Sequence, residues 1–248
     1  MINSNFKIFQ TYYDSSHKEK LSPEFEHLDV SANPIPEMRE FPIIRDLYKE
    51  GRHKEQEYTG LVSFKMEEKM ASLSHGGNGL FNAYPEIKEF LSFNKGYDVY
   101  IFNPFRYDLS LKNVWRQGEG VHTGICDKVD FLFRELSTEY PNDSIFKRDN
   151  SVKYDEYDLH TYSMCNYWVG NEKFWNKYIN FVGKVYDFMN GDSISSELKD
   201  SITSKTLHHG EGEVWYVPFI IERLTSSLIY WDEDIKSLGW KNNWKEGY

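Results

Sequence analysis

Phe6-Lys7-Ile8-Phe9-Gln10-Thr11-Tyr12-Tyr13 is the stretch that decides the fold, because it has the pattern of the first strand of a sheet. Its residues alternate, and they are rich in aromatic and β-branched side chains until Asp14-Ser15-Ser16 breaks the run. Similar apolar runs recur at 58–64, 98–102 and 162–169. The run at 98–102 follows a segment with apolar residues at helical spacing, and the run at 162–169 precedes such a segment. Strands that alternate with helices predict a mostly parallel central sheet flanked by helices, here in one Rossmann-like α/β domain over residues 1–248.

Apolar residues at helical spacing mark the helices between these strands. One helix is predicted from Met38 to the stop at Gly51, and another begins with the charged run that follows residue 64. Further helices are predicted at 84–93, from a cap at Asp127 to Pro141, from 174 to Gly191, and from Pro218 onward. The polar segment 141–158 is interpreted as a long loop.

Composition excludes several classes of function. The chain carries 29 Lys and Arg against 39 Asp and Glu, so its surface should repel phosphate backbones, and we expect no nucleic-acid partner. No stretch approaches the roughly 20 apolar residues that cross a bilayer, and the first residues lack the layout of a signal peptide, which favours a cytoplasmic protein. The two cysteines are far apart and indicate buried thiols rather than a zinc site. Aromatic residues make up 17% of the chain, which suits a saccharide cleft but equally a biased genome composition.

The strand at 98–102 ends abruptly at Asn103-Pro104. Proline cannot donate to a ladder, so the chain must leave the sheet there. Ligands of α/β proteins gather where strands end, which makes Asn103 the first choice for a ligand-binding residue. A turn-forming Asn-Pro pair is the alternative.

Four segments together resemble bacterial glycosyltransferases of the GT-A type, in particular those of capsule and O-antigen biosynthesis. They are residues 7–13, residues 57–65 with the Tyr58-Thr59-Gly60-Leu61 pattern, residues 162–169 followed by Phe174-Trp175, and residues 218–224 with Glu222-Arg223-Leu224. The resemblance implies a nucleotide-sugar donor and a glycan acceptor, and it leaves open a peripheral association with a membrane-bound assembly complex. It assigns the donor to Gln10, Thr11, Tyr12, Tyr13, Ser63, Lys65, Lys69, Asn103 and Pro104, and the acceptor to Asn166, Tyr167 and Trp168.

The sequence departs from that family in its metal motif. GT-A enzymes usually carry an Asp-x-Asp at the end of a central strand to hold Mn²⁺ or Mg²⁺, whereas this chain has Asn103-Pro104 there. Asp232-Glu233-Asp234 is the literal copy, and we interpret it as a solvated acidic turn. Metal dependence therefore stays open, with Asn103, His208 and His209 as weak ligand candidates. Cations could instead neutralise the leaving diphosphate, with Lys65, Lys69, Arg106 and Arg116 as candidates.

Three residues are candidates for catalysis by proton transfer. Glu119 and His122 lie in the Gly-rich segment 117–124, where the backbone could approach a sugar closely. Glu222 lies on the predicted C-terminal helix, where an ion pair with Arg223 or another cation is the alternative. Two other functions stay possible: a noncatalytic carbohydrate-binding or assembly module, and a glycoside hydrolase that would use Glu119 and Glu222 as its two carboxylates.

Overall fold

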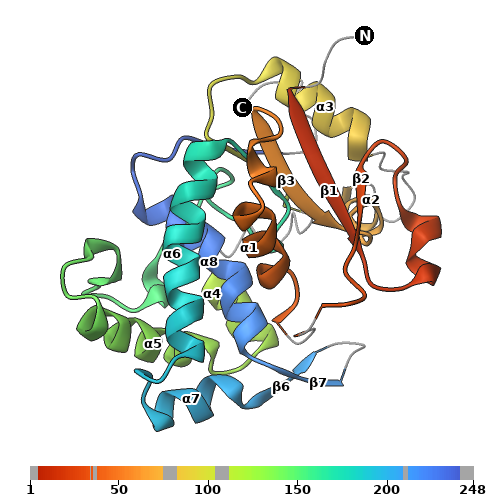
Figure 1. Ribbon diagram of the computed structural model, residues 1–248. Helices are drawn as coiled ribbons and strands as arrows, with labels where there is room; N and C mark the ends of the chain where they lie inside the picture. The colour runs from red at the N-terminus through yellow and green to blue at the C-terminus, as the bar shows by residue number, and fades with distance from the viewer. Residues whose placement is uncertain are drawn as a thin grey trace.

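A computed structural model describes residues 5–33, 35, 38–74, 83–103, 112–208 and 212–240. These residues form a six-stranded sheet in the order β2-β1-β3-β5-β4-β8 and a separate hairpin (Figure 1). The sheet strands are β1 (Phe6–Tyr12), β2 (Glu26–Asp29), β3 (Tyr58–Ser63), β4 (Val99–Ile101), β5 (Trp168–Gly170) and β8 (Ser237–Gly239), and the hairpin strands are β6 (Lys205–His208) and β7 (Gly212–Trp215). The predicted α/β fold with a mostly parallel central sheet is confirmed.

One reversed strand, β5, divides the sheet into two parallel parts. β1 pairs in parallel with β2 and with β3, and β4 pairs in parallel with β8. β5 lies between β3 and β4 and is antiparallel to both, with Trp168 opposite Leu61 on one side and Ile101 on the other. The residues that precede β5 therefore lie at the same edge as the carboxyl ends of β1, β3 and β4.

Helices cover both faces of this sheet (Figure 1). On one face α6 contacts β3, because Trp175 donates its indole hydrogen to the Thr59 carbonyl over 2.9 Å, and α1 packs on α6 through Phe41 and Tyr178. On the other face α3 contacts β4, where the Phe90 ring meets Tyr100. The helices are α1 (Phe41–Lys49), α2 (Met66–Ser74), α3 (Ala83–Phe93), α4 (Val114–Val121), α5 (Ile125–Glu139), α6 (Glu172–Asn190), α7 (Ser196–Thr203) and α8 (Val217–Trp231).

The remaining helical turns are short 3-10 segments on the surface loops. They are η1 (Ser15–Lys20), η3 (Arg52–Lys54), η5 (Ser144–Phe146) and η6 (Val152–Tyr154), and the last two break up the predicted loop 141–158. In the part of the chain that the structure describes, no helix is long and apolar enough to cross a bilayer.

Most predicted elements lie within a few residues of their expected positions, but the strand at 162–169 is largely wrong. Only Trp168 and the two residues after it are paired in the sheet. Earlier in this segment, the Ser163 backbone nitrogen donates a hydrogen bond to the hydroxyl of Ser226 in α8 over 2.6 Å. The same hydroxyl donates to the Ser163 carbonyl over 2.8 Å. The backbone of this segment is thus bonded to a helix instead of a neighbouring strand.

The expected cap at Asp127 is also wrong. α5 begins at Ile125, after Gly124, which has a positive φ of 86° that suits glycine. Asp127 lies in the first turn of the helix, where its charge complements the helix dipole. The sequence analysis did not find β2, α4, α7, β8 or the β6–β7 hairpin.

Candidate active site

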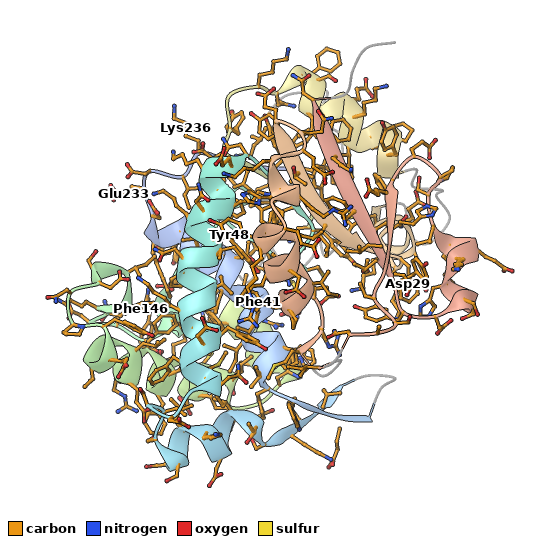
Figure 2. The ribbon with its side chains drawn as sticks, in the orientation of Figure 1. Asp29, Phe41, Tyr48, Phe146, Glu233 and Lys236 are labelled. Atoms are coloured by element: carbon orange, nitrogen blue, oxygen red, sulfur yellow. The ribbon has the colours of Figure 1, made fainter. Side chains whose placement is uncertain are left out.

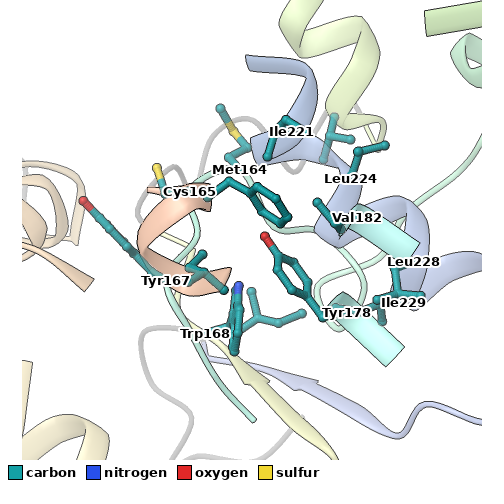
Figure 3. Close-up of a cluster of buried hydrophobic side chains, with 14 of the residues drawn as sticks. Met164, Cys165, Tyr167, Trp168, Tyr178, Val182, Ile221, Leu224, Leu228 and Ile229 are labelled. Carbon is teal, nitrogen blue, oxygen red and sulfur yellow. The ribbon is translucent and has the colours of Figure 1, made fainter. Parts of the chain in front are cut away.

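Tyr167 joins the two halves of the sheet at the edge where the parallel strands end. Its hydroxyl lies 2.5 Å from the hydroxyl of Ser63, the last residue of β3, and its carbonyl accepts the Phe102 backbone hydrogen of the β4 end over 2.8 Å. Figure 3 shows Tyr167 pointing away from the apolar cluster around Trp168 and Tyr178. Burial raises the pKa of Tyr167, so the hydroxyl stays protonated and can act as a hydrogen-bond donor.

Lys69 brings a positive charge to this edge from the first turns of α2. Its ammonium lies 3.7 Å from the Cys165 sulfur and 5.5 Å from the centre of the Tyr167 ring. The Cys165 sulfur, and after it Tyr167 and the Glu222 and Glu40 carboxylates, raise the pKa of Lys69. Lys69 is half-buried and remains charged at neutral pH, which suits the recognition of a phosphate.

Glu222 of α8 supplies a carboxylate to the same group of residues. Burial raises its pKa, although Arg223, Lys69 and Arg39 act in the opposite direction. The Glu222 side chain is half-buried. Solvent or a substrate can therefore reach it, although protein surrounds it on most sides. A partly exposed carboxylate with a raised pKa is suited to accept a proton near neutral pH.

Arg39 and Glu40 complete the site, and the sequence analysis missed both. The Tyr13 hydroxyl at the end of β1 donates to Glu40 over 3.3 Å. The Arg39 guanidinium lies 4.9 Å from the centre of the Phe219 ring, in the first turn of α8. These residues precede α1, and no motif in the sequence distinguishes them from an ordinary helix start. Side chains from the ends of β1 and β3, from the start of α2, from α8 and from the residues before α1 are therefore linked at this edge.

Asn103, the candidate at the end of a strand, and Asn166, which the resemblance assigns to the acceptor, lie beside Tyr167. Asn103 follows β4 and is 8% exposed, and Asn166 is 6% exposed and accepts a hydrogen bond from Thr225 of α8 over 3.3 Å. Pro104, the next residue assigned to the donor site, lies outside the described residues.

Three other residues assigned to the donor lie beneath or beside this edge. Gln10 and Thr11 are fully buried, where Gln10 accepts the Ser22 backbone hydrogen over 2.8 Å and Thr11 donates to the Val62 carbonyl over 3.4 Å. Their side chains support the strand end and are covered by protein. Tyr12 faces Lys18 of η1, whose ammonium lies 5.2 Å from the ring.

Lys65 and Asp29 line the outer part of the edge. Lys65 is exposed, with its ammonium 5.6 Å from the centre of the Phe64 ring. Asp29 ends β2 next to β1, and hydrogen bonds from Ser31 and from the Tyr12 hydroxyl lower its pKa. Figure 2 shows Asp29 on the side of the sheet where β2 lies. The sequence analysis missed Asp29 because it did not predict β2.

Glu119 and His122 are not brought to this site, which argues against the catalytic roles predicted for them. Their segment forms α4 and the corner after it, and Glu119 accepts backbone hydrogens from Gly124 over 2.5 Å and Cys126 over 3.1 Å at the start of α5. His122 is 1% exposed and stacks on Phe219 with ring centres 3.8 Å apart. Both side chains serve the packing of the helical layer.

Trp168 and Arg223 also have structural surroundings. Trp168 is fully buried against α6, with its ring 4.9 Å from Trp175 and 5.0 Å from Tyr178, so the acceptor contact predicted for it is wrong. Arg223 is 3% exposed and donates to the carbonyls of Val114 and Phe219, each over 3.0 Å. These two backbone carbonyls hold the guanidinium, for which the sequence had suggested an ion pair.

The described residues hold no group of three or more His, Cys, Asp or Glu side chains that could bind a metal ion. His208 ends β6, and His209 lies outside the described residues. Asp232 of the acidic turn forms a 2.6 Å ion pair with Lys177.

A cavity of about 730 Å³ lies elsewhere, between η5, α6 and the acidic turn after α8. Glu233, which lines it, is on the opposite side of the molecule from Asp29 (Figure 2). Its cations are largely paired: Arg148 with Asp155 over 2.6 Å, and Lys177 with Asp232. We therefore place the candidate active site at the strand ends, where side chains with perturbed pKa values meet.

A mixed sheet covered on both faces, with polar side chains at the ends of its parallel strands, defines the Rossmann-like class of α/β folds. No family model matches the chain, and no curated protein matches it significantly. Among solved structures, the chain is similar to the apo structure of the WbbM bifunctional glycosyltransferase, with a TM-score of 0.52 and 15% sequence identity. The match covers 94% of this chain but only 44% of WbbM, and it shows a common fold.

Proposed function

We propose that this protein is a glycosyltransferase that moves a sugar from a nucleotide-sugar to a hydroxyl group of a bacterial surface glycan. The observation that carries the proposal is the meeting of Glu222, Lys69 and Tyr167 at the ends of the parallel strands. Its fold likeness to WbbM, itself a bifunctional glycosyltransferase, supports the same class of activity. Because the chain spans less than half of WbbM, the likeness gives no donor or acceptor.

Lys69 would bind the diphosphate of the donor. An ammonium that is partly removed from water interacts more strongly with phosphate than one at the surface, because the effective dielectric constant is lower. Tyr13, Ser63 and Asn103 surround the same strand ends and would hold the nucleoside and sugar. Lys69 would then stabilise the negative charge that develops on the leaving diphosphate.

Glu222 would be the general base. The acceptor hydroxyl oxygen forms a bond to the anomeric carbon, the bond from that carbon to the diphosphate oxygen breaks, and the hydroxyl proton passes to Glu222. The nucleoside diphosphate leaves with the electron pair. Only the ionised carboxylate can take a proton, and burial raises its pKa, so activity should rise with pH as Glu222 loses its proton.

Isothermal titration against UDP and GDP sugars, with and without Mn²⁺, tests the proposal. We expect at least one donor to bind, and we expect Lys69→Gln to weaken its binding about tenfold or more, as the loss of a charge-assisted contact should. Lys65→Gln is the matched control, because Lys65 is exposed whereas Lys69 faces Cys165 and Glu222. We expect it to change the affinity less than threefold, on the order of a surface ion pair.

The alternatives make different predictions in the same experiment. A noncatalytic carbohydrate-binding module would bind none of the nucleotides, with or without Mn²⁺. A hydrolase would release free sugar from a glycan in the absence of any donor. The carboxylate pair first considered for hydrolysis is not formed, because Glu119 bonds to the start of α5 while Glu222 faces Lys69.

A further inference from the structure

Arg39 has a backbone conformation that arginine rarely adopts. Its φ is 52°, and in the described part of the chain Lys112, with φ of 49°, is the other non-glycine residue with a positive φ. The left-handed conformation costs an L-residue stability, and such residues cluster at ligand-binding sites because function retains them there. Arg39 therefore invites the question of what its side chain does.

The side chain is held beside the proposed catalytic base. The guanidinium stacks on Phe219 at 4.9 Å, and Phe219 stacks on His122 at 3.8 Å, so its position is fixed by a buried column of rings. Phe219 and Glu222 are three residues apart on α8 and thus lie on the same face. The positive charge of Arg39 acts to lower the pKa of Glu222 and that of Tyr13, so these three side chains interact electrostatically.

Lys69 and Arg39 are held by different parts of the fold. Lys69 belongs to the sheet edge, where it contacts Cys165 and Tyr167, whereas Arg39 belongs to the first turn of α8 through Phe219. Lys69 and Arg39 are both cations outside α8 that act on the Glu222 carboxyl, so if Lys69 binds the donor diphosphate, Arg39 is left to bind the acceptor. A planar guanidinium held in a fixed orientation is suited to bind a carboxylate or a phosphate through two parallel hydrogen bonds.

We propose that Arg39 is a specificity residue that binds an oxyanion on the acceptor, borne by a sugar carboxylate or by a phosphate. This inference rests on the proposed function, because it takes Glu222 as the base and Lys69 as the donor site. The acceptor of this enzyme would accordingly be an acidic saccharide or a glycosyl phosphate, and neutral sugars would bind poorly.

The test is a titration with glucuronate, glucose 1-phosphate and glucose, with the side-chain Nε–H signal of Arg39 observed by NMR. A saturating nucleoside diphosphate keeps the probes away from Lys69. We expect at least one anionic probe to shift the Arg39 signal and to bind tenfold or more tightly than glucose, and the stronger of the two identifies the source of the charge. Arg39→Gly should abolish this preference while raising the melting temperature, because glycine relieves the strained backbone.

Lys112→Gly is the matched control, since it relieves the same kind of strain at an exposed residue. It should raise the melting temperature and leave the preference for anions unchanged. Equal binding of glucose and both anions would refute the proposal, and so would an Arg39→Gly variant that keeps the preference. The nucleotide titration separates the two claims: if no nucleotide binds, the transferase falls, and the same probes without nucleotide still decide whether Arg39 binds an oxyanion.

Discussion

Glu222 and Glu119 were both candidate catalytic carboxylates, and exchanging each for glutamine should give opposite results. Glu222→Gln removes the proposed general base, which should lower turnover by about 100- to 10,000-fold, or roughly 2.7 to 5.4 kcal/mol in activation free energy. Stability should not fall, because burial raises the pKa of Glu222 and so disfavours the ionised form in the folded protein.

The sign of this effect on stability can be checked by changing the pH. A carboxyl with a raised pKa binds its proton more tightly in the folded than in the unfolded chain, so its contribution is fully present below its ordinary pKa of 4.5. That contribution is lost as pH rises through the raised pKa. Glu222→Gln should therefore gain stability relative to the parent between acid and neutral pH.

Glu119→Gln should lower the stability and leave turnover nearly unchanged. Glu119 accepts two backbone hydrogens at the start of α5, over 2.5 and 3.1 Å. Loss of its charge at a helix N-terminus should cost about 1 to 2 kcal/mol, from the cap and the dipole together. For a chain of this size that corresponds to a melting temperature lower by roughly 2 to 8 °C. Turnover per folded molecule should stay within about twofold, since surface effects away from the site are small.

The assay compares the two variants with the parent by calorimetry and by release of nucleoside diphosphate from the donor that the titration identifies. The reasoning fails if Glu222→Gln turns over at the parental rate. It fails equally if Glu119→Gln loses activity at an unchanged melting temperature, because Glu119 would then have a role at the substrate.

Two further predictions concern helix glycines and a buried histidine. Gly118→Ala should lower the unfolding free energy by about 1 to 3 kcal/mol in urea, because its Cβ would lie 2.8 Å from the Nε of the hydrogen-bonded Arg223. Gly120→Ala on the same helix meets nothing within 4 Å and should be neutral or stabilising by up to about 1 kcal/mol. His53 is 3% exposed, and burial lowers its pKa below the ordinary 6.5, so unfolding takes up a proton and stability should fall as pH drops below that value. His53→Phe keeps the ring stacked on Tyr48 and should reduce this loss, whereas an unchanged pH profile would assign it to other groups.

The sequence predicts the fold well where the apolar pattern is long and regular. β1, β3 and α6 were found because burial leaves a strict period of strand or helix in their residues. β5 was misplaced because the buried, aromatic-rich segment before it has the composition of a strand, and only the distant Ser226 shows where its hydrogen bonds go. β8 is three residues long, and its pairing with β4 depends on contacts across most of the chain.

The candidate site was predicted in part, for a related reason. Asn103 was a candidate because it follows a strand, and Lys69 because it is a cation that could bind the diphosphate; the structure brings both to the edge where the strands end. Arg39 and Glu40 belong to the site through the docking of α1 beside α8, which no local pattern encodes. Glu119 was misinterpreted because a carboxylate that caps a helix and one that accepts a proton cannot be told apart by residue type.

The reversed strand in the middle of the sheet also sets the order in which the strands can pair during synthesis. β4 reaches β3 only through β5, and β5 emerges about a hundred residues after β3, so nascent β4 has no partner of its own while the ribosome makes the intervening helices. At roughly 5 to 20 residues per second this wait lasts several seconds. Assembly through such distant pairings is slow, and the two halves of this sheet edge join only late in synthesis.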